Sequence, residues 1–232
     1  MVLVMRISFT VWCKDDRALN RSLGRLREIR RFGDEIIVAD LGSQDPDVVK
    51  ALSLADSVVH LPAHLKISEA RNAAMSRASG DIVVSMDADT WVPDGVIGAL
   101  LKAFSNPRIV AAACNVKAYP WLETGQDKAF LRLLNLRFRL AFLAGRPCAR
   151  GEFQIFRNVG IRYDPNLSSG EDCEIMGRHA GRAVYLNQVT VYESPKRYRV
   201  KSYVGTFLTW FRYWLVLRVF NRSLPYVTIP KD

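Results

Sequence analysis

The chain contains few of the residues that hold metal-bound or disulfide-bonded folds together. It has only four cysteines and three histidines among its 232 residues. No CxxC pair occurs, and no cysteine and histidine cluster has the spacing of a zinc site, which excludes zinc-binding modules and CxxC redox proteins. The widely scattered cysteines are Cys13, Cys114, Cys148 and Cys173. We expect them to be buried free thiols.

Long apolar runs are also missing at the N-terminus. The run in residues 1–6 is too short for a signal peptide and continues into a strand pattern, so we expect a cytoplasmic protein. Apolar residues make up 49% of the chain, which is enough for a sizeable core. At this length, we expect one domain with an appendage.

Acidic residues are outnumbered by basic ones, 23 to 33, which gives a net charge of +10. Such a surface favours anionic partners. Phosphates, nucleic acid and an acidic membrane surface are all compatible with the charge alone.

Strand and helix patterns alternate through the first half of the chain. Short apolar runs predict strands at residues 7–12, 35–39, 57–60 and 82–86. Helical patterns follow at residues 17–31, 47–54, 68–78 and 94–104, with Ser68 as the expected N-cap of the third helix. A further strand is expected at residues 183–193. This order predicts an α/β fold whose mostly parallel sheet carries helices on both faces.

Acidic residues follow three of these strands. Asp15 and Asp16, then Asp40, then Asp87 and Asp89 each come just after a strand, where ligands of open parallel sheets bind. The period of a strand places Asp87 and Asp89 on the same side. Two carboxylates there suit Mg²⁺ or Mn²⁺ carrying a diphosphate, because these ions prefer oxygen ligands. The alternative interpretation is a solvated Asp-x-Asp turn.

Five short motifs occur in an order and register that resemble the family 2 nucleotide-sugar glycosyltransferases with the GT-A fold. The resemblance extends over about residues 7–199. The motifs are WCKDD at 12–16, DLGSQD at 40–45, ARN at 70–72, DAD at 87–89 and GED at 170–172. The resemblance implies transfer of a sugar, such as the hexoses mannose or glucose, from a nucleoside diphosphate sugar.

The resemblance also implies roles for the donor-side residues. Asp16 and Asp40 would hold the nucleoside, since a carboxylate can accept hydrogen bonds from ribose hydroxyls and from the base edge. Arg71 would lie near the base or the diphosphate. Asp87 would contact the ribose side and contribute to the metal site, and Asp89 would bind Mn²⁺ or Mg²⁺.

Three departures from the family pattern leave the base of the donor open. Lys14 replaces a usual aromatic, Trp12 a usual proline, and Leu41 the second aspartate of its loop. Both GDP-sugars and UDP-sugars therefore stay possible donors. For Arg71, the alternative is an ordinary arginine on a helix surface.

The catalytic residues implied by the resemblance are Glu171 and Asp172. Asp172 would be the general base for a hydroxyl acceptor in one in-line, inverting displacement, and Glu171 would orient the acceptor or the base. With a phosphate acceptor, which is already ionised, Asp172 would position the acceptor instead. The alternative for Asp172 is a helix cap.

The basic segment at residues 194–199 resembles one that many family members place over the donor diphosphate. We expect Arg197 to make this contact, although Lys196 and Arg199 are not distinguished from it. A solvated basic loop is the alternative.

Two aromatic and basic segments, residues 130–143 and 203–220, indicate membrane contact. Internal arginines disfavour a spanning helix, so an amphipathic helix in the membrane interface fits better. We divide the chain into a GT-A domain at 1–200 and a helical extension at 201–232. The expected location is peripheral, at the cytoplasmic face, with a polyprenyl phosphate or lipid-linked glycan as acceptor. Packing of both segments on the domain or in a dimer is the alternative.

Three other functions fit parts of the sequence less well. A nucleic-acid-binding protein suits the net charge, but no recognition motif is present and the acidic strand ends would repel phosphates, so we expect no nucleic-acid partner. An inactive sugar-nucleotide-binding protein would not need both Asp89 and Asp172. A nucleotidyltransferase would need a glycine-rich basic loop where Asp15 and Asp16 stand.

Overall fold

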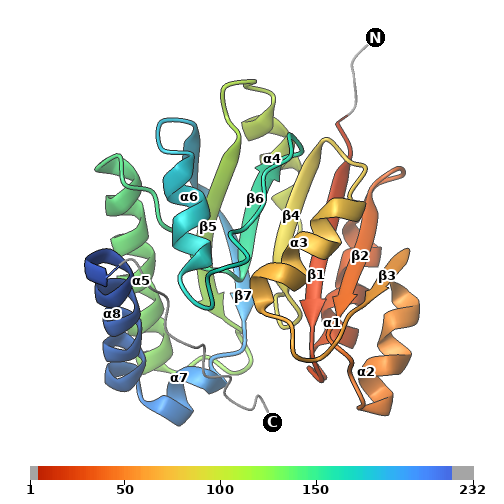
Figure 1. Ribbon diagram of the computed structural model, residues 1–232, viewed down its shortest axis with the longest axis horizontal. Helices are drawn as coiled ribbons and strands as arrows, with labels where there is room; N and C mark the ends of the chain where they lie inside the picture. The colour runs from red at the N-terminus through yellow and green to blue at the C-terminus, as the bar shows by residue number, and fades with distance from the viewer. Residues whose placement is uncertain (1–4, 221–232) are drawn as a thin grey trace.

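The computed structural model describes residues 5–220 and places them around one seven-stranded sheet (Figure 1). The strand order is β3-β2-β1-β4-β6-β5-β7. The strands are β1 (Ile7–Cys13), β2 (Glu35–Asp40), β3 (Ser57–His60), β4 (Ile82–Asp87), β5 (Ala111–Ala118), β6 (Phe153–Arg157) and β7 (Ala183–Glu193). The helices are α1 (Leu19–Ile29), α2 (Pro46–Ala51), the 3₁₀ helix η1 (Leu52–Leu54), α3 (Ile67–Arg77), α4 (Val96–Phe104), α5 (Gly125–Leu143), α6 (Glu171–Arg178), α7 (Lys196–Lys201) and α8 (Tyr203–Phe220).

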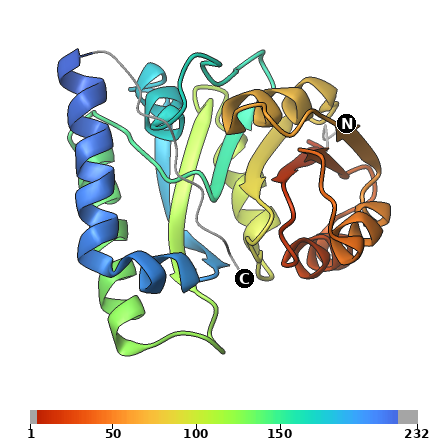
Figure 2. The same cartoon turned by 60° about the horizontal axis from the view of Figure 1, so that its bottom comes forward.

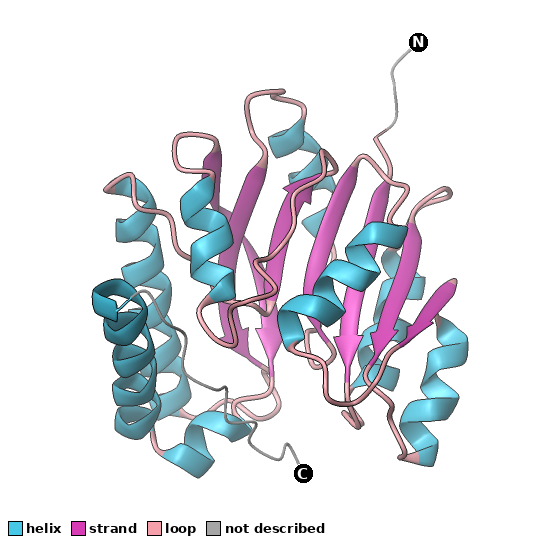
Figure 3. Ribbon diagram, in the orientation of Figure 1, coloured by secondary structure: helices cyan, strands magenta, loops and turns pink. Residues whose placement is uncertain are grey.

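Helices cover both faces of the sheet (Figure 3). Because side chains alternate along a strand, Ile7, Phe9 and Val11 of β1 all reach the core shared with α1, α2 and α4. The opposite face packs against α3 and α6, where Met75 and Ile175 are buried. This two-sided burial explains why the strands read as apolar runs in the sequence.

The predicted α/β fold with a mostly parallel sheet is confirmed. The exception is β6, which runs antiparallel to both β4 and β5. The sequence patterns did not single out β5 or β6. At the carboxyl edge, Trp12 of β1 lies beside Asp87 of β4, and Cys13 lies beside Asp40 of β2. The acidic strand ends are therefore neighbours, as the topology required.

The start of α3 differs from the sequence prediction. The helix begins at Ile67 with Lys66 as its N-cap, and the Glu69 carboxylate accepts a 2.9 Å hydrogen bond from the Lys66 backbone N–H. Ser68 is therefore not the cap. Its hydroxyl instead donates to the Leu167 carbonyl at 3.2 Å, which ties α3 to the loop before α6.

The C-terminal helix α8 lies along α5 at one end of the sheet, as both views show (Figures 1 and 2). Phe130 of α5 packs against Trp210, with ring centroids 6.4 Å apart, and against Tyr198 of α7 at 5.2 Å. One side of α8 therefore packs on the domain, which was the alternative to membrane contact for this segment. Residues 221–232 of the expected extension lie outside the described residues.

Candidate active site

A buried ion pair stands at the carboxyl ends of β1 and β4. Arg71 Nη2 donates to Asp87 Oδ1 at 2.8 Å, and the Trp12 indole N–H donates to the same oxygen at 2.6 Å. Arg71 is only 4% exposed, so it is not an ordinary surface arginine. Removing either charge would leave its partner buried and uncompensated.

A close backbone approach fixes the position of this arginine. A β-carbon added to Gly151 would lie 2.4 Å from Arg71 Nη2, so glycine leaves the space that the guanidinium occupies. The Tyr163 hydroxyl accepts from Arg71 Nη1 at 3.3 Å and donates to Gln154 Oε1 at 2.6 Å. Gln154 Nε2 then donates to the backbone carbonyl of Asp172 at 2.8 Å. A chain of hydrogen bonds thus joins the ion pair to α6.

Helix α6 presents two adjacent carboxylates in its first turn, those of Glu171 and Asp172. Gly170 is the N-cap and adopts φ 79°, a left-handed conformation that favours glycine. Asp172 is therefore not the cap residue, although its Oδ1 accepts from the Cys173 backbone N–H at 2.8 Å. Both carboxylates are partly buried.

Burial and, to a smaller extent, the neighbouring charge of Glu171 raise the pKa of Asp172 to about 7, against the opposing effect of Arg71. Burial also raises the pKa of Glu171, while Arg71 lowers it. Two close carboxylates in a partly desolvated site resist ionising together. A carboxyl group that titrates near neutral pH is suited to proton transfer.

The ion pair and the two carboxylates line one cavity of about 160 Å³. The structure therefore brings together Arg71 and Asp87 with Glu171 and Asp172, which lie far apart in the sequence. The wall also includes Trp12, Arg137, Phe138, Arg150, Glu152, Arg197 and Trp210.

A second, larger groove of about 1190 Å³ contains the other donor-side candidates, Asp16 and Asp89. Asp87 lines the smaller cavity and Asp89 lines the groove, so the strand period that placed them on one side does not by itself describe their positions. The reason is that β4 ends at Asp87 and a turn follows, so the strand period does not extend to Asp89.

Asp40 lines neither of these two cavities. It is 4% exposed at the end of β2, and its Oδ1 accepts from the Ser43 backbone N–H at 3.1 Å. Asp40 Oδ2 lies 3.3 Å from His60 Nδ1. Asp15, at φ 48°, accepts from the backbone N–H groups of Gln44 and Asp45 at 2.6 and 2.9 Å, which joins the loops after β1 and β2.

Arg197 lies in a network of buried charges. The segment at 194–199 is not a loop throughout, because α7 begins at Lys196. Arg197 pairs with Glu152 and, at 2.6 Å, with Glu193, and Arg150 pairs with the same two carboxylates. The network fixes α7 against the sheet at the wall of the smaller cavity.

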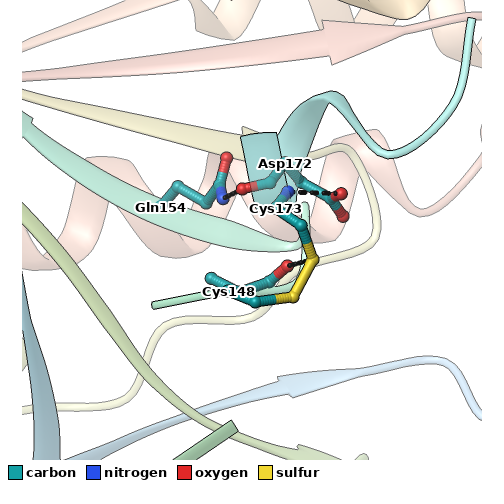
Figure 4. The surroundings of a disulfide bond; sticks show 5 residues. Cys148, Gln154, Asp172 and Cys173 are labelled. Carbon is teal, nitrogen blue, oxygen red and sulfur yellow. Dashed lines mark hydrogen bonds between the residues drawn. A yellow bond between two sulfur atoms is a disulfide. The ribbon is translucent and has the colours of Figure 1, made fainter. Parts of the chain in front are cut away.

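The expectation of four free thiols is wrong for two cysteines. Cys148, before β6, forms a disulfide with Cys173, which directly follows Asp172 (Figure 4). A separation of 25 residues and the absence of a CxxC motif hid this pair, because the fold alone brings the loop before β6 to the first turn of α6. Cys13 and Cys114 are buried free thiols, as expected.

The residues that could hold a metal ion are carboxylates. Within residues 5–220, no group of three or more histidine, cysteine or acidic side chains has the geometry of a complete metal site. Mg²⁺ and Mn²⁺ nevertheless often use one or two protein carboxylates and take the other ligands from substrate phosphates and water. Asp89, which is 2% exposed and lines the groove with Asp16, suits such a site.

The pattern of the family described as "Glycosyl transferase family 2" matches residues 14–166. The chain belongs to glycosyl transferase family 2. An N-acetylglucosaminyltransferase of Rhizobium leguminosarum bv. trifolii is 33% identical over 82 residues, which cover 33% of this chain and 45% of that protein. Another of that name, from Rhizobium sp. (strain N33), is 28% identical over 56% of this chain and 27% of that protein. The chain thus spans less than half of the length of these curated relatives.

Solved structures show that this family 2 chain has the GT-A fold expected from the sequence. The mannosyltransferase PcManGT from Pyrobaculum calidifontis, in complex with GDP-Man and Mn²⁺, has a TM-score of 0.63 at 20% identity. That match covers 91% of this chain and 65% of the other. S. aureus TarS 1–349 in complex with UDP-GlcNAc has a TM-score of 0.61 at 18% identity, over 82% of this chain and 58% of the other.

Sequence reasoning missed several residues that shape the family 2 site. Gly151, Tyr163 and Gln154 position the charged groups through packing and hydrogen bonds. No sequence motif marks a tyrosine or glutamine for this role. The sequence Arg150-Gly151-Glu152, with two opposite charges around a glycine, was the only visible signal.

Proposed function

We propose that this chain is an inverting glycosyltransferase that moves a sugar from a nucleoside diphosphate sugar to an acceptor, with Mn²⁺ or Mg²⁺. The observation that carries the proposal is the cavity in which Arg71 and Asp87 face the same space as Glu171 and Asp172. Cations suit a diphosphate, and a carboxylate of raised pKa suits a proton acceptor. The printed names of relatives and fold neighbours, with their nucleotide sugars, support this assignment.

In the proposed reaction, Asp172 takes the proton from an acceptor hydroxyl as that oxygen attacks the anomeric carbon. Burial and then the charge of Glu171 keep the pKa of Asp172 high enough for it to hold that proton near neutral pH. Arg71, held by Asp87, offers its guanidinium to the donor diphosphate. Arg197 also lines this cavity, although its ion pairs with Glu152 and Glu193 neutralise much of its charge.

Asp89, with Asp16 in the same groove, would hold the divalent ion. When bound, the ion would supply positive charge that stabilises the departing nucleoside diphosphate. Asp87 is the weaker candidate of the two aspartates, since Arg71 and Trp12 both donate to its Oδ1. Asp40 and Asp16 remain the proposed nucleoside-binding residues.

A screen for the donor tests the function. Thermal shift is measured with UDP-glucose, UDP-GlcNAc and GDP-mannose, each with and without Mn²⁺. We expect at least one to raise the melting temperature more with Mn²⁺, since ligand binding to the native state stabilises it. Binding without any turnover, in the presence of candidate acceptors, would favour the inactive sugar-nucleotide-binding alternative. No binding by any donor would contradict the proposal.

We also propose that α5 and α8 contact the membrane at its cytoplasmic face, where the acceptor is a lipid-linked glycan or polyprenyl phosphate. The outer faces of the two adjacent helices expose large apolar side chains. These are Leu133, Leu136, Leu140 and Leu143 on α5, with Val204, Phe207, Leu208 and Phe211 on α8. Large apolar side chains gathered on exposed helix surfaces suit an interaction site.

Basic residues within the same helices suit anionic headgroups. Arg132 and Arg139 are exposed on α5 and Arg212 on α8. Among the described residues, no helix combines the length and apolar character needed to cross a bilayer. The surface therefore supports contact in the plane of the interface.

Flotation with anionic liposomes tests the membrane proposal. Replacing Leu208 and Phe211 with serine should greatly reduce binding, because these side chains are 57% and 49% exposed and would enter the interface. The matched control is Phe32→Ser, since Phe32 is fully exposed on the loop after α1, away from both helices. Wild-type protein that stays in the soluble fraction at low salt would contradict membrane contact.

A further inference from the structure

The larger groove contains an aromatic shelf, made of Tyr119 and Trp121, that the proposed reaction does not use. The two rings stack with centroids 4.8 Å apart and an interplanar angle of 14°. Tyr119 is 3% exposed, whereas Trp121 is 53% exposed. A large, flat indole thus faces solvent on a buried support, in the same groove as Asp16 and Asp89.

The shelf is fixed to the site by several contacts. The Tyr119 hydroxyl donates to the backbone carbonyl of Asp89, and the Tyr119 backbone N–H donates to the Glu193 carbonyl at 3.0 Å. Trp91 meets Trp121 edge to face, with centroids 6.5 Å apart at 89°. A rigid aromatic surface binds a ligand with little loss of conformational freedom.

Polar groups surround the exposed indole. Asp16, Asn20 and Ser194 line the same groove and offer carboxylate, amide and hydroxyl groups. The Arg21 guanidinium carbon lies 5.2 Å from the Trp121 ring centroid. The groove therefore combines one flat apolar surface with hydrogen-bond acceptors and donors at its margin.

A pyranose ring has this same combination of properties. One face carries C–H groups and is apolar, and its margin carries hydroxyls that donate and accept hydrogen bonds. The groove is also several times larger than the smaller cavity, about 1190 against 160 Å³, so it has room for more than one ring. These features favour a saccharide over a single nucleobase, which would stack equally well but needs less space.

We propose that Trp121 and Tyr119 form a binding subsite for a sugar ring of the acceptor. The inference rests on the proposed glycosyl transfer and narrows it, because the acceptor then carries a saccharide and is not a sugar-free polyprenyl phosphate. Trp121 is the contacting residue, and Tyr119 is its support. Asn20 and Ser194 of the same groove bind hydroxyls at the edge of the ring.

Calorimetry with defined oligosaccharides tests the subsite. The probes are a tetramer of N-acetylglucosamine and a tetramer of mannose, titrated into wild type, Trp121→Ala and Trp121→Phe. We expect one of the tetramers to bind wild type, Trp121→Ala to weaken that binding at least tenfold, and Trp121→Phe to retain most of it. Trp121 is 53% exposed, so Trp121→Ala should stay folded with a modestly lower melting temperature, which reflects the lost stacking contact with Tyr119.

Titration of UDP and GDP into the same proteins separates the competing outcomes. Equal saccharide affinity in wild type and Trp121→Ala, or no saccharide binding to wild type, overturns the subsite. Loss of nucleotide affinity in Trp121→Ala, with saccharide binding intact, would instead make the shelf a base platform. If no nucleotide sugar binds wild type while the saccharide result holds, the proposed function fails and the subsite stands.

Discussion

Replacing Asp172 with asparagine should stabilise the protein at high pH while removing its activity. The Asp172 pKa is about 7 in the folded protein, chiefly because of burial and then because of Glu171, against an ordinary value of 3.8. Between these values the folded state holds a proton that the unfolded chain releases. The unfolding free energy therefore falls as the pH rises from about 4 to about 7.

The size of this effect follows from the two pKa values. The cost of ionising Asp172 in the folded protein is at most about 4 kcal/mol above pH 7, and it vanishes below pH 4. Asparagine has nearly the same shape and no charge, so it removes the cost. Part of the stability gained by Asp172→Asn comes from relief of the repulsion between the two carboxylates, which also eases the ionisation of Glu171.

Urea unfolding at pH 4.5 and pH 8 measures the difference between wild type and Asp172→Asn. We expect the variant to be more stable at pH 8 by roughly 1–4 kcal/mol, with a much smaller difference at pH 4.5. Turnover should fall by about 10²–10⁴, the usual range for a lost general base, while donor affinity changes only a few-fold. The reasoning would be refuted if Asp172→Asn were less stable than wild type at pH 8, or if its unfolding free energy differed from that of wild type by the same amount at both pH values.

Two further predictions concern the walls of the same cavity. Gly151→Ala should displace the Arg71 guanidinium and lower donor affinity at least tenfold, because the new methyl carbon would lie 2.4 Å from Arg71 Nη2. The matched control is Gly98→Ala, at a helical position with open space. Unchanged donor affinity in Gly151→Ala would contradict the packing argument. Replacing Cys148 and Cys173 with serine should lower the unfolding free energy by roughly 3 kcal/mol under oxidising conditions, because the disulfide closes a loop of 25 residues. In urea unfolding, reduced wild type should be as stable as the double serine variant. Equal stability of oxidised wild type and the variant would contradict this prediction.

The positions of the acidic strand ends were predictable because they depend on local patterns and on topology. Apolar runs alternate with helical periods, and parallel strands end at one edge, so Asp40 and Asp87 were expected at the same edge of the sheet, where β1 lies between their strands. The separate roles of Arg71, Glu171 and Asp172 came from the family resemblance, and no local pattern indicated that they line one cavity. The GT-A fold expected from that resemblance is confirmed by solved structures.

The parts that sequence reasoning missed depend on tertiary contacts. The disulfide joins the loop before β6 to α6, and Gly151 matters because the Arg71 guanidinium lies against it. Ser68 looked like a cap because serine commonly is one, but Glu69 and Lys66 satisfy that helix end. The segment at residues 203–220 was expected at the membrane, yet its Trp210 packs against Phe130 of α5 and Tyr198 of α7.

Calorimetric titration of the donor identified by the screen, into wild type and Asp89→Ala with and without Mn²⁺, tests the central claim most directly. The account predicts that Mn²⁺ strengthens binding to wild type and that Asp89→Ala loses this strengthening, because the diphosphate loses its cationic bridge. Asp45→Ala, which removes another carboxylate of the same groove, should keep it. Metal-dependent affinity that is unchanged in Asp89→Ala would contradict the account.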